Sequence, residues 1–252
     1  MNLNNTFTFF EILEFRNTNL IIFEILLSII FLPLIGFLIS ITKTINQSIC
    51  VLLTVFLIFN SFILSLYIFI LNLKQPNVLF IKISSWINVG NINITYSFLF
   101  DSLTIVMLLT VTLISFLVNV YSLAYIDKEA NLNRFIAFLS IFTFFMLILI
   151  SAGNFLLMFL GWEGVGLTSY LLINFFHHRI DANKSAIKAV IVNRIGDFFF
   201  FFSIILIVFV FKCLDFILIS LLNDEKDALD QINLVRLQYS YKKITITIAK
   251  IA

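Results

Sequence analysis

The stretch that decides the fold runs from Phe135 to Phe176, FIAFLSIFTFFMLILISAGNFLLMFLGWEGVGLTSYLLINFF. As one helix it would measure about 63 Å, roughly twice the thickness of the hydrocarbon core of a bilayer. The run must therefore fold back on itself, and Ser151-Ala152-Gly153-Asn154 is the turn-like cluster within it. We predict two membrane spans, Phe135–Ile150 and Asn154–Phe176, joined by a tight turn.

The composition of the whole chain supports this interpretation. Of 252 residues, 61% are hydrophobic and 12% are charged, whereas soluble domains carry about 25% charged residues. A formal net charge of +2 is too small to indicate a nucleic-acid partner. Cys50 and Cys213 lie far apart without a histidine cluster, which favours neither a disulfide framework nor a metal site. The 32 phenylalanines and only 7 glycines suggest A+T-rich codons, as in many organellar genomes.

Three apolar runs before this stretch predict three further spans. They cover Ile25–Thr42, Thr44–Leu73 and Ser102–Ile126. Between the second and third, Lys74–Ser97 is more polar and partly alternating, which predicts a hairpin or extended loop outside the lipid. The fold class is thus an all-α membrane protein with about six transmembrane helices and one short extended loop.

The sixth span requires charged residues inside the membrane. Phe198 to Phe211 would measure only about 21 Å as a helix, which is too short to cross. A crossing helix must reach back to about Ser185, and this places Arg194 and Asp197 within the membrane. The apolar segment after Lys212 is too short to cross, and we expect it at the interface or against a partner.

Glu163 is the one Asp, Glu, Lys or Arg between Phe135 and His178. It lies about nine residues, or roughly 14 Å, into its span, near mid-membrane. A charge there costs about 2.5–3.5 kcal/mol, and intramembrane acids usually have a function. Glu163 can be a structural hydrogen-bond partner or a site that carries protons. The neighbouring glycines, Gly161, Gly164 and Gly166, would allow helices or water to approach the backbone closely, and their spacing does not fit a dinucleotide-binding motif.

Arg194 and Asp197 are three positions apart and share a helix face, so a local ion pair is one explanation. Counted from the same membrane face, however, Asp197 and Glu163 lie at similar depth, with Arg194 about one turn away. If spans five and six are neighbours, we expect a Glu163–Arg194–Asp197 cluster. His177 and His178 end span five at the water boundary, where they are either solvated or a proton antenna.

Three motifs carry a family resemblance: FDSLT at 100–104, FLGWEGVGLTSYLLINF at 159–175, and DANKSAIKAVIVNRIGDF at 181–198. Together they resemble the antiporter-like subunit 5 of proton-pumping NADH:ubiquinone oxidoreductase, respiratory complex I. The resemblance covers about Phe98 to Phe199, and we see none from about Lys212 onward. It implies that Glu163 matches the family's key glutamate and that Asp197 matches the acid closing the sixth-helix motif.

The resemblance also implies an enzyme complex, with this chain as a subunit of the proton-translocating NADH:ubiquinone reductase. NADH, FMN, iron–sulfur clusters and ubiquinone would belong to other subunits, and we expect no cofactor or metal on this chain. The implied location is the mitochondrial inner membrane, with organelle encoding. The implied partners are other complex I membrane subunits and membrane lipids, and no nucleic acid.

The sequence departs from the family in one respect. In the family, the key glutamate works with a lysine of a GKSAQ-type motif, and the 252 residues contain no such motif. We expect a split subunit whose second chain supplies the rest of the module. The expected parts are an N-terminal segment (1–24), two helices and a loop (25–97), the N-terminal half of the antiporter-like module (98–212), and an interfacial or partner-binding tail (213–252). The alternative functions are a non-pumping scaffold of the distal membrane arm and a subunit of a multi-component Na⁺/H⁺ antiporter.

Overall fold

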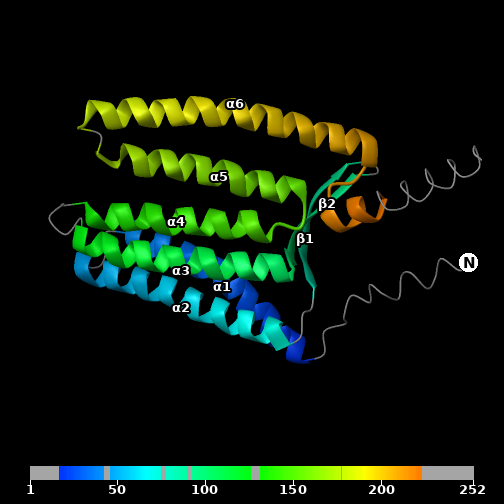
Figure 1. Ribbon diagram of the computed structural model, residues 1–252, viewed down its shortest axis with the longest axis horizontal. Coiled ribbons are helices and arrows are strands. Elements are labelled where there is room, and N and C mark those ends of the chain that lie inside the picture. The colour runs from blue at the N-terminus through cyan, green and yellow to red at the C-terminus, as the bar shows by residue number, and fades with distance from the viewer. Residues whose placement is uncertain are drawn as a thin grey trace, which may run out of the picture.

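The computed structural model describes residues 17–42, 46–74, 78–89, 92–125, 131–176 and 178–222. Six long helices run roughly alongside one another, and a two-stranded hairpin closes one end (Figure 1). The helices are α1 (Asn17–Ile41), α2 (Gln47–Lys74), α3 (Ser102–Tyr125), α4 (Leu132–Ser151), α5 (Phe155–Ile173) and α6 (Ile180–Phe211). All six are long and apolar enough to cross a membrane, so the predicted fold class is confirmed.

The core lies among α1 to α4, which pack into a bundle. Leu26 and Ile29 of α1, Leu108 of α3 and Leu147 of α4 are fully or almost fully buried there. Small hydroxyl side chains allow close helix contact, as where Ser65 of α2 and Thr112 of α3 are hydrogen-bonded at 2.8 Å. The bundle of α1 to α4 therefore lies on one side of α5 and contacts it through α4.

The predicted extended segment forms a β-hairpin. Strands β1 (Leu79–Val89) and β2 (Ile92–Phe100) pair antiparallel. Trp86 stacks on Tyr96 with ring centroids 4.5 Å apart, a cross-strand aromatic pair of the kind that stabilises two-stranded sheets. The hairpin lies at the end of the helices where α4 meets α5 (Figure 1).

The predicted turn between spans four and five is confirmed, and it is held from two sides. Toward the hairpin, Gly153 N donates to Ser97 O at 2.9 Å, and a Cβ at Gly153 would lie 2.9 Å from that oxygen. Toward the segment after α6, Phe155 N donates to Leu214 O and Phe216 N donates to Gly153 O, both at 3.2 Å. The turn thus ties the hairpin, the start of α5 and the end of α6 together.

Asn154, fully buried, makes this junction specific. Its Oδ1 accepts from Leu157 N at 2.8 Å, which caps the N-terminus of α5. Its Nδ2 donates to Thr95 O of β2 at 2.6 Å. One side chain therefore fixes the first turn of α5 against the hairpin.

Helix α6 begins about five residues before the expected Ser185 and spans 32 residues. That length corresponds to about 48 Å, more than a bilayer core, so α6 must tilt or extend beyond the lipid. It packs along α5 on the side away from the bundle (Figure 1). Beyond it, residues 216–222 are helical, and Leu214 is buried with Ile94 and Ile204. The division into four parts stays a prediction, and residues 1–16 and 223–252 lie outside the described residues.

Candidate functional site

An ion pair joins α5 and α6 along their apolar length. Arg194 Nη1 of α6 donates to Glu163 Oε1 of α5 at 3.0 Å. Both ends are charged, so this hydrogen bond is stronger than a neutral one. Arg194 thus pairs with the acid on the neighbouring helix, and the local pair with Asp197 considered from the sequence is not formed.

Asp197 has a different partner, which the sequence analysis did not identify. Trp162 Nε1 donates to Asp197 Oδ1 at 3.0 Å, and the indole also contacts the Phe200 ring edge-to-face at 6.1 Å between centroids. Trp162 directly precedes Glu163, so consecutive residues of α5 each bind a polar residue of α6. The one signal in the sequence for this hydrogen bond was the position of Trp162 directly before Glu163.

Glycines determine which face of α5 meets the bundle. A Cβ at Gly161 would lie 2.8 Å from the Leu149 backbone of α4, and one at Gly164 would overlap the Phe145 ring. The expected close helix approach is therefore confirmed at these two positions. At Gly166 the nearest atom to a Cβ would be Asn193 Nδ2 of α6, at an ordinary 3.5 Å. Because two glycines lock one face of α5 to α4, the side chain of Glu163 is left to meet α6.

The three predicted site residues line one pocket between α5 and α6. The pocket has a volume of about 510 Å³ and also includes Tyr170 and Asn193. The Arg194 and Glu163 side chains are 69% and 45% exposed, so the described residues leave this face open. A charged pair facing lipid would be costly at mid-membrane, which indicates that further protein or water covers it.

The structure brings Glu163 and Arg194 into direct contact and places Asp197 beside them through Trp162. The role of these residues in proton transfer stays a prediction. His177 lies outside the described residues, whereas His178 lies in the short segment between α5 and α6. Among the described residues no group of three or more His, Cys, Asp or Glu side chains could hold a metal ion.

Two family models match the chain. Residues 86–136 match the N-terminus of chain 5 of NADH-ubiquinone oxidoreductase, complex I. Residues 152–249 match the transmembrane region shared by NADH:quinone oxidoreductases and Mrp antiporters. The second match corrects the sequence analysis, which saw no resemblance from about Lys212 onward.

Curated relatives are similar to a large part of the chain. The chain is 51% identical over 152 residues to NADH-ubiquinone oxidoreductase chain 5 of Dictyostelium citrinum, and this covers 60% of the chain and 23% of that relative. It is 46% identical over 186 residues to the chain 5 of Acanthamoeba castellanii, covering 73% of the chain and 27% of the relative. The matched region thus spans about a quarter of the length of these relatives.

A solved structure shares the fold. The membrane-bound sulfane sulfur reductase, an archaeal respiratory membrane complex, contains a chain that superimposes with a TM-score of 0.67 at 17% identity. The superposition covers 75% of this chain and 38% of that one. At this identity the similarity supports the helical architecture alone.

Proposed function

Because this chain belongs to the family of complex I chain 5, over the N-terminal part of that family's length, we propose that it contributes to proton translocation in the membrane arm of complex I. The chain would work as one subunit of the NADH:ubiquinone reductase. Electron transfer would take place on other subunits, which would hold NADH, FMN, iron–sulfur clusters and ubiquinone. Its six apolar helices suit a multi-pass position in the mitochondrial inner membrane, and we extend the proposal to organelle encoding.

The observation that carries this proposal is the Glu163–Arg194 ion pair at 3.0 Å between two membrane-spanning helices. A carboxylate in this position can take up a proton, and protonation cancels its charge. The guanidinium cannot release its proton under ordinary conditions. Protonation of Glu163 therefore leaves Arg194 as an uncompensated cation that must find another partner.

Asp197 is the nearest candidate on the same helix. It lies three positions after Arg194 and hence on the same helix face, and Trp162 holds it beside the pair. We propose that Arg194 pairs with Glu163 while that acid is ionised and turns toward Asp197 when Glu163 is protonated. One proton on Glu163 would thereby be converted into a movement of positive charge along α6.

The open face of this pocket needs a covering partner. Our proposal is that other residues of the antiporter-like module, on a second chain as the sequence analysis expected, close it and exchange protons with Glu163. Native mass spectrometry of the assembled complex checks this. A co-migrating chain with a GKSAQ-type motif supports the split arrangement, and its absence contradicts it.

The function is tested by replacing Glu163 with Gln in the assembled complex and measuring protons moved per electron in sealed vesicles. Gln keeps the shape and a hydrogen-bond acceptor but cannot be protonated at neutral pH. We expect normal assembly and a lower proton-to-electron ratio. An unchanged ratio with intact assembly would favour the scaffold function.

A Na⁺/H⁺ antiporter is the second candidate, because the model matched by residues 152–249 also describes Mrp antiporters. Identities of 46–51% to complex I chains favour complex I. Proton movement that requires electron transfer but not Na⁺ would support that choice, whereas Na⁺-dependent proton movement would support the antiporter.

A further inference from the structure

A second pocket lies where α4 begins and α5 ends, and its volume is about 360 Å³. We name it the boundary pocket, because both helices are candidate membrane spans and a span ends where the lipid gives way to water. Its polar lining includes Asn131, Arg134 and His178. Because a polar pocket of this size can hold water, the boundary pocket is a place where water enters the end of the helix bundle.

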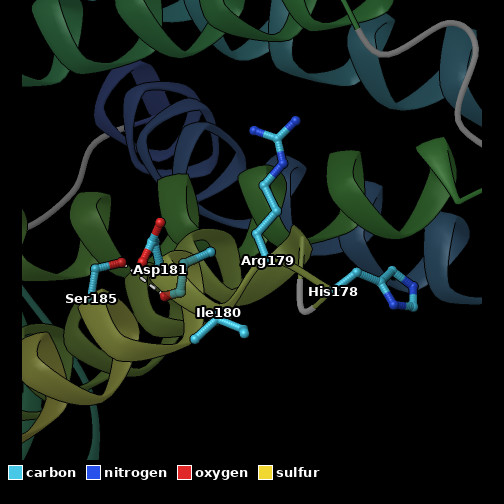
Figure 2. Close-up of a pocket in the computed structure, with 6 residues that line it drawn as sticks. His178, Arg179, Ile180, Asp181 and Ser185 are labelled. Atoms are coloured by element: carbon cyan, nitrogen blue, oxygen red, sulfur yellow. Dashed lines mark hydrogen bonds between the residues drawn. The ribbon is translucent and has the colours of Figure 1, made fainter.

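The boundary pocket adjoins a wider hollow at the loop before α6. His178 lines both spaces, and the hollow has a volume of about 700 Å³. Figure 2 shows this hollow, with His178 and Arg179 extending from the loop in different directions and Asp181 and Ser185 contributed by α6. His178, Arg179 and Asp181 are all exposed. Water can therefore reach the boundary pocket from this side.

Leu171 lies between the boundary pocket and the pocket that holds Glu163. Among the described residues it is the one that lines both pockets. It follows Glu163 by eight positions, which places the two residues on the same face of α5, about 12 Å apart along the helix axis. Tyr170, one position earlier, lines the Glu163 pocket but not the boundary pocket. An apolar residue thus separates two spaces that both contain polar groups.

An apolar residue in this position blocks protons by excluding water. Protons move along chains of hydrogen-bonded water and polar groups, and a leucine side chain has no atom that can join such a chain. Hydrophobic constrictions close water-filled paths in this way, by dewetting. Further apolar residues belong to the two linings, Phe138 and Phe175 in the boundary pocket and Ile187 in the Glu163 pocket. A water chain from the boundary pocket toward Glu163 is therefore interrupted at Leu171.

Arg134 adds an electrostatic barrier on the water side of Leu171. Its Cζ lies 5.6 Å from the centroid of the Phe138 ring, and this cation–π contact restrains the guanidinium at the boundary pocket. The guanidinium keeps its charge at every ordinary pH. A fixed cation opposes the entry of another positive charge. The boundary pocket therefore suits a closed side of the proton path better than an entrance.

We propose that Leu171 is a hydrophobic barrier that prevents Glu163 from exchanging protons with water at the end of the membrane where α5 ends. This proposal rests on the proposed role of Glu163 in proton transfer. With the barrier in place, Glu163 exchanges protons on its open side toward α6. A proton that the complex has moved cannot then return past Leu171.

The test measures passive proton leak in sealed vesicles that contain the assembled complex, without NADH. A pH step is imposed across the membrane, and the internal pH is followed with a dye. Leu171→Ser should raise the leak rate about tenfold, because a small hydroxyl side chain no longer excludes water. The double variant Leu171→Ser/Glu163→Gln should return the leak to the wild-type rate, because Gln cannot pass the proton on.

The matched control is Leu172→Ser, which makes the same change one position later, outside both pockets. It should leave the leak rate unchanged. Leu171→Met keeps an apolar side chain of similar volume and should also leave the leak unchanged. If Leu171→Ser fails to assemble, Leu171→Ala shortens the side chain without adding a polar group, and the leak should still rise severalfold.

Three results would overturn the proposal: a wild-type leak rate in Leu171→Ser, an equal increase in Leu172→Ser, or a leak that persists in the double variant. The proposed function is tested separately, because the proton-to-electron ratio of Glu163→Gln is measured during electron transfer. A wild-type leak rate in Leu171→Ser together with a lowered ratio in Glu163→Gln would contradict the barrier and leave the proposed function standing.

Discussion

Helices α4 and α6 are both apolar enough to cross a membrane, yet they differ in surroundings. In α4 half of the most apolar window is buried inside the chain, whereas in α6 only 6% of it is. Helix α4 packs against α1, α2, α3 and α5, whereas α6 packs against α5 and the short 3₁₀ turn that follows it, Asn174–Phe176. Helix α5 lies between them, with glycines toward α4 and polar side chains toward α6.

The two faces of α5 therefore have different roles: the face toward α4 holds the helix in place, and the face toward α6 carries the charged residues. The α4–α5 contact is close and apolar, so it fixes α5 in place. The α5–α6 contact holds the Glu163–Arg194 pair and the Trp162–Asp197 hydrogen bond, which we propose rearrange when Glu163 takes up a proton. A rigid contact on one side of α5 and an adjustable one on the other suit a proton-carrying site.

Substitutions in the turn between α4 and α5 should have the largest effect on stability. Asn154→Ala removes the cap on Leu157 N and leaves Thr95 O without its donor. We expect a loss of about 2–4 kcal/mol in stability, seen as a lower midpoint temperature of the assembled complex. Asn154→Ser keeps a side-chain oxygen that can cap Leu157 N, and it should cost less. Equal losses in both variants would show that the cap on α5 contributes nothing.

A glycine-to-alanine substitution should disrupt the close α4–α5 contact but not α6. Gly161→Ala places a methyl group 2.8 Å from the Leu149 backbone, and overpacking of this kind costs about 1–3 kcal/mol. Gly196→Ala on α6 meets nothing within 4 Å, so helix propensity should stabilise it by up to about 1 kcal/mol. The yield of assembled complex after mild heating compares the two, and opposite signs are expected.

Stability should be less sensitive to substitutions in the α5–α6 contact. Trp162→Phe keeps an aromatic ring near Phe200 but removes the donor to Asp197. Because the indole is about half exposed, we expect a stability loss of only about 1 kcal/mol. A shift in the pH profile of proton translocation should accompany it. A profile identical to the wild type would contradict a role for Asp197 next to the ion pair.

The smallest effect should come from Asp215, in the segment after α6. Burial raises the pKa of its carboxyl group above the ordinary 3.8, and the positive charge of Lys82 partly opposes this. The folded state therefore holds the proton more tightly than the unfolded state. Stability contributed by the protonated carboxyl should decline as pH rises from about 4 through the raised pKa. Asp215→Asn should remove this decline.

Protection of the Phe155 amide against hydrogen exchange, corrected for the intrinsic pH dependence of exchange, measures the Asp215 effect. This amide donates to Leu214 O and reports the junction directly. The Leu157 amide, bonded to Asn154, is an internal reference. A pH dependence that survives in Asp215→Asn would assign it to another group.

Span arithmetic predicted much of this fold, because membrane thickness fixes helix length. The run Phe135–Phe176 is too long to be one span, and its turn lies where the sequence placed it. Depth counting placed Glu163 and Asp197 at similar depth with Arg194 about one turn away, and the structure pairs Glu163 with Arg194. The start of α6 was missed because Asp181, Asn183 and Lys184 are polar and suggest a loop, although Asp181 suits a helix N-terminus.

Long-range contacts could not be predicted in this way. The junction of Asn154 with Thr95 joins residues 59 positions apart, and no local periodicity encodes it. The Trp162–Asp197 hydrogen bond depends on the rotation of α5 about its axis, which the Gly161 and Gly164 contacts with α4 determine. Glycine spacing indicated close packing but did not indicate which helix would be the partner.

The central claim is that the Glu163 carboxyl group changes its protonation during turnover. Infrared difference spectroscopy of the assembled complex, before and during NADH oxidation, measures this through the C=O band of protonated carboxylic acids. The account predicts a turnover-dependent band in the wild type that is lost in Glu163→Gln and retained in Asp215→Asn. Identical difference spectra for the wild type and Glu163→Gln would contradict it.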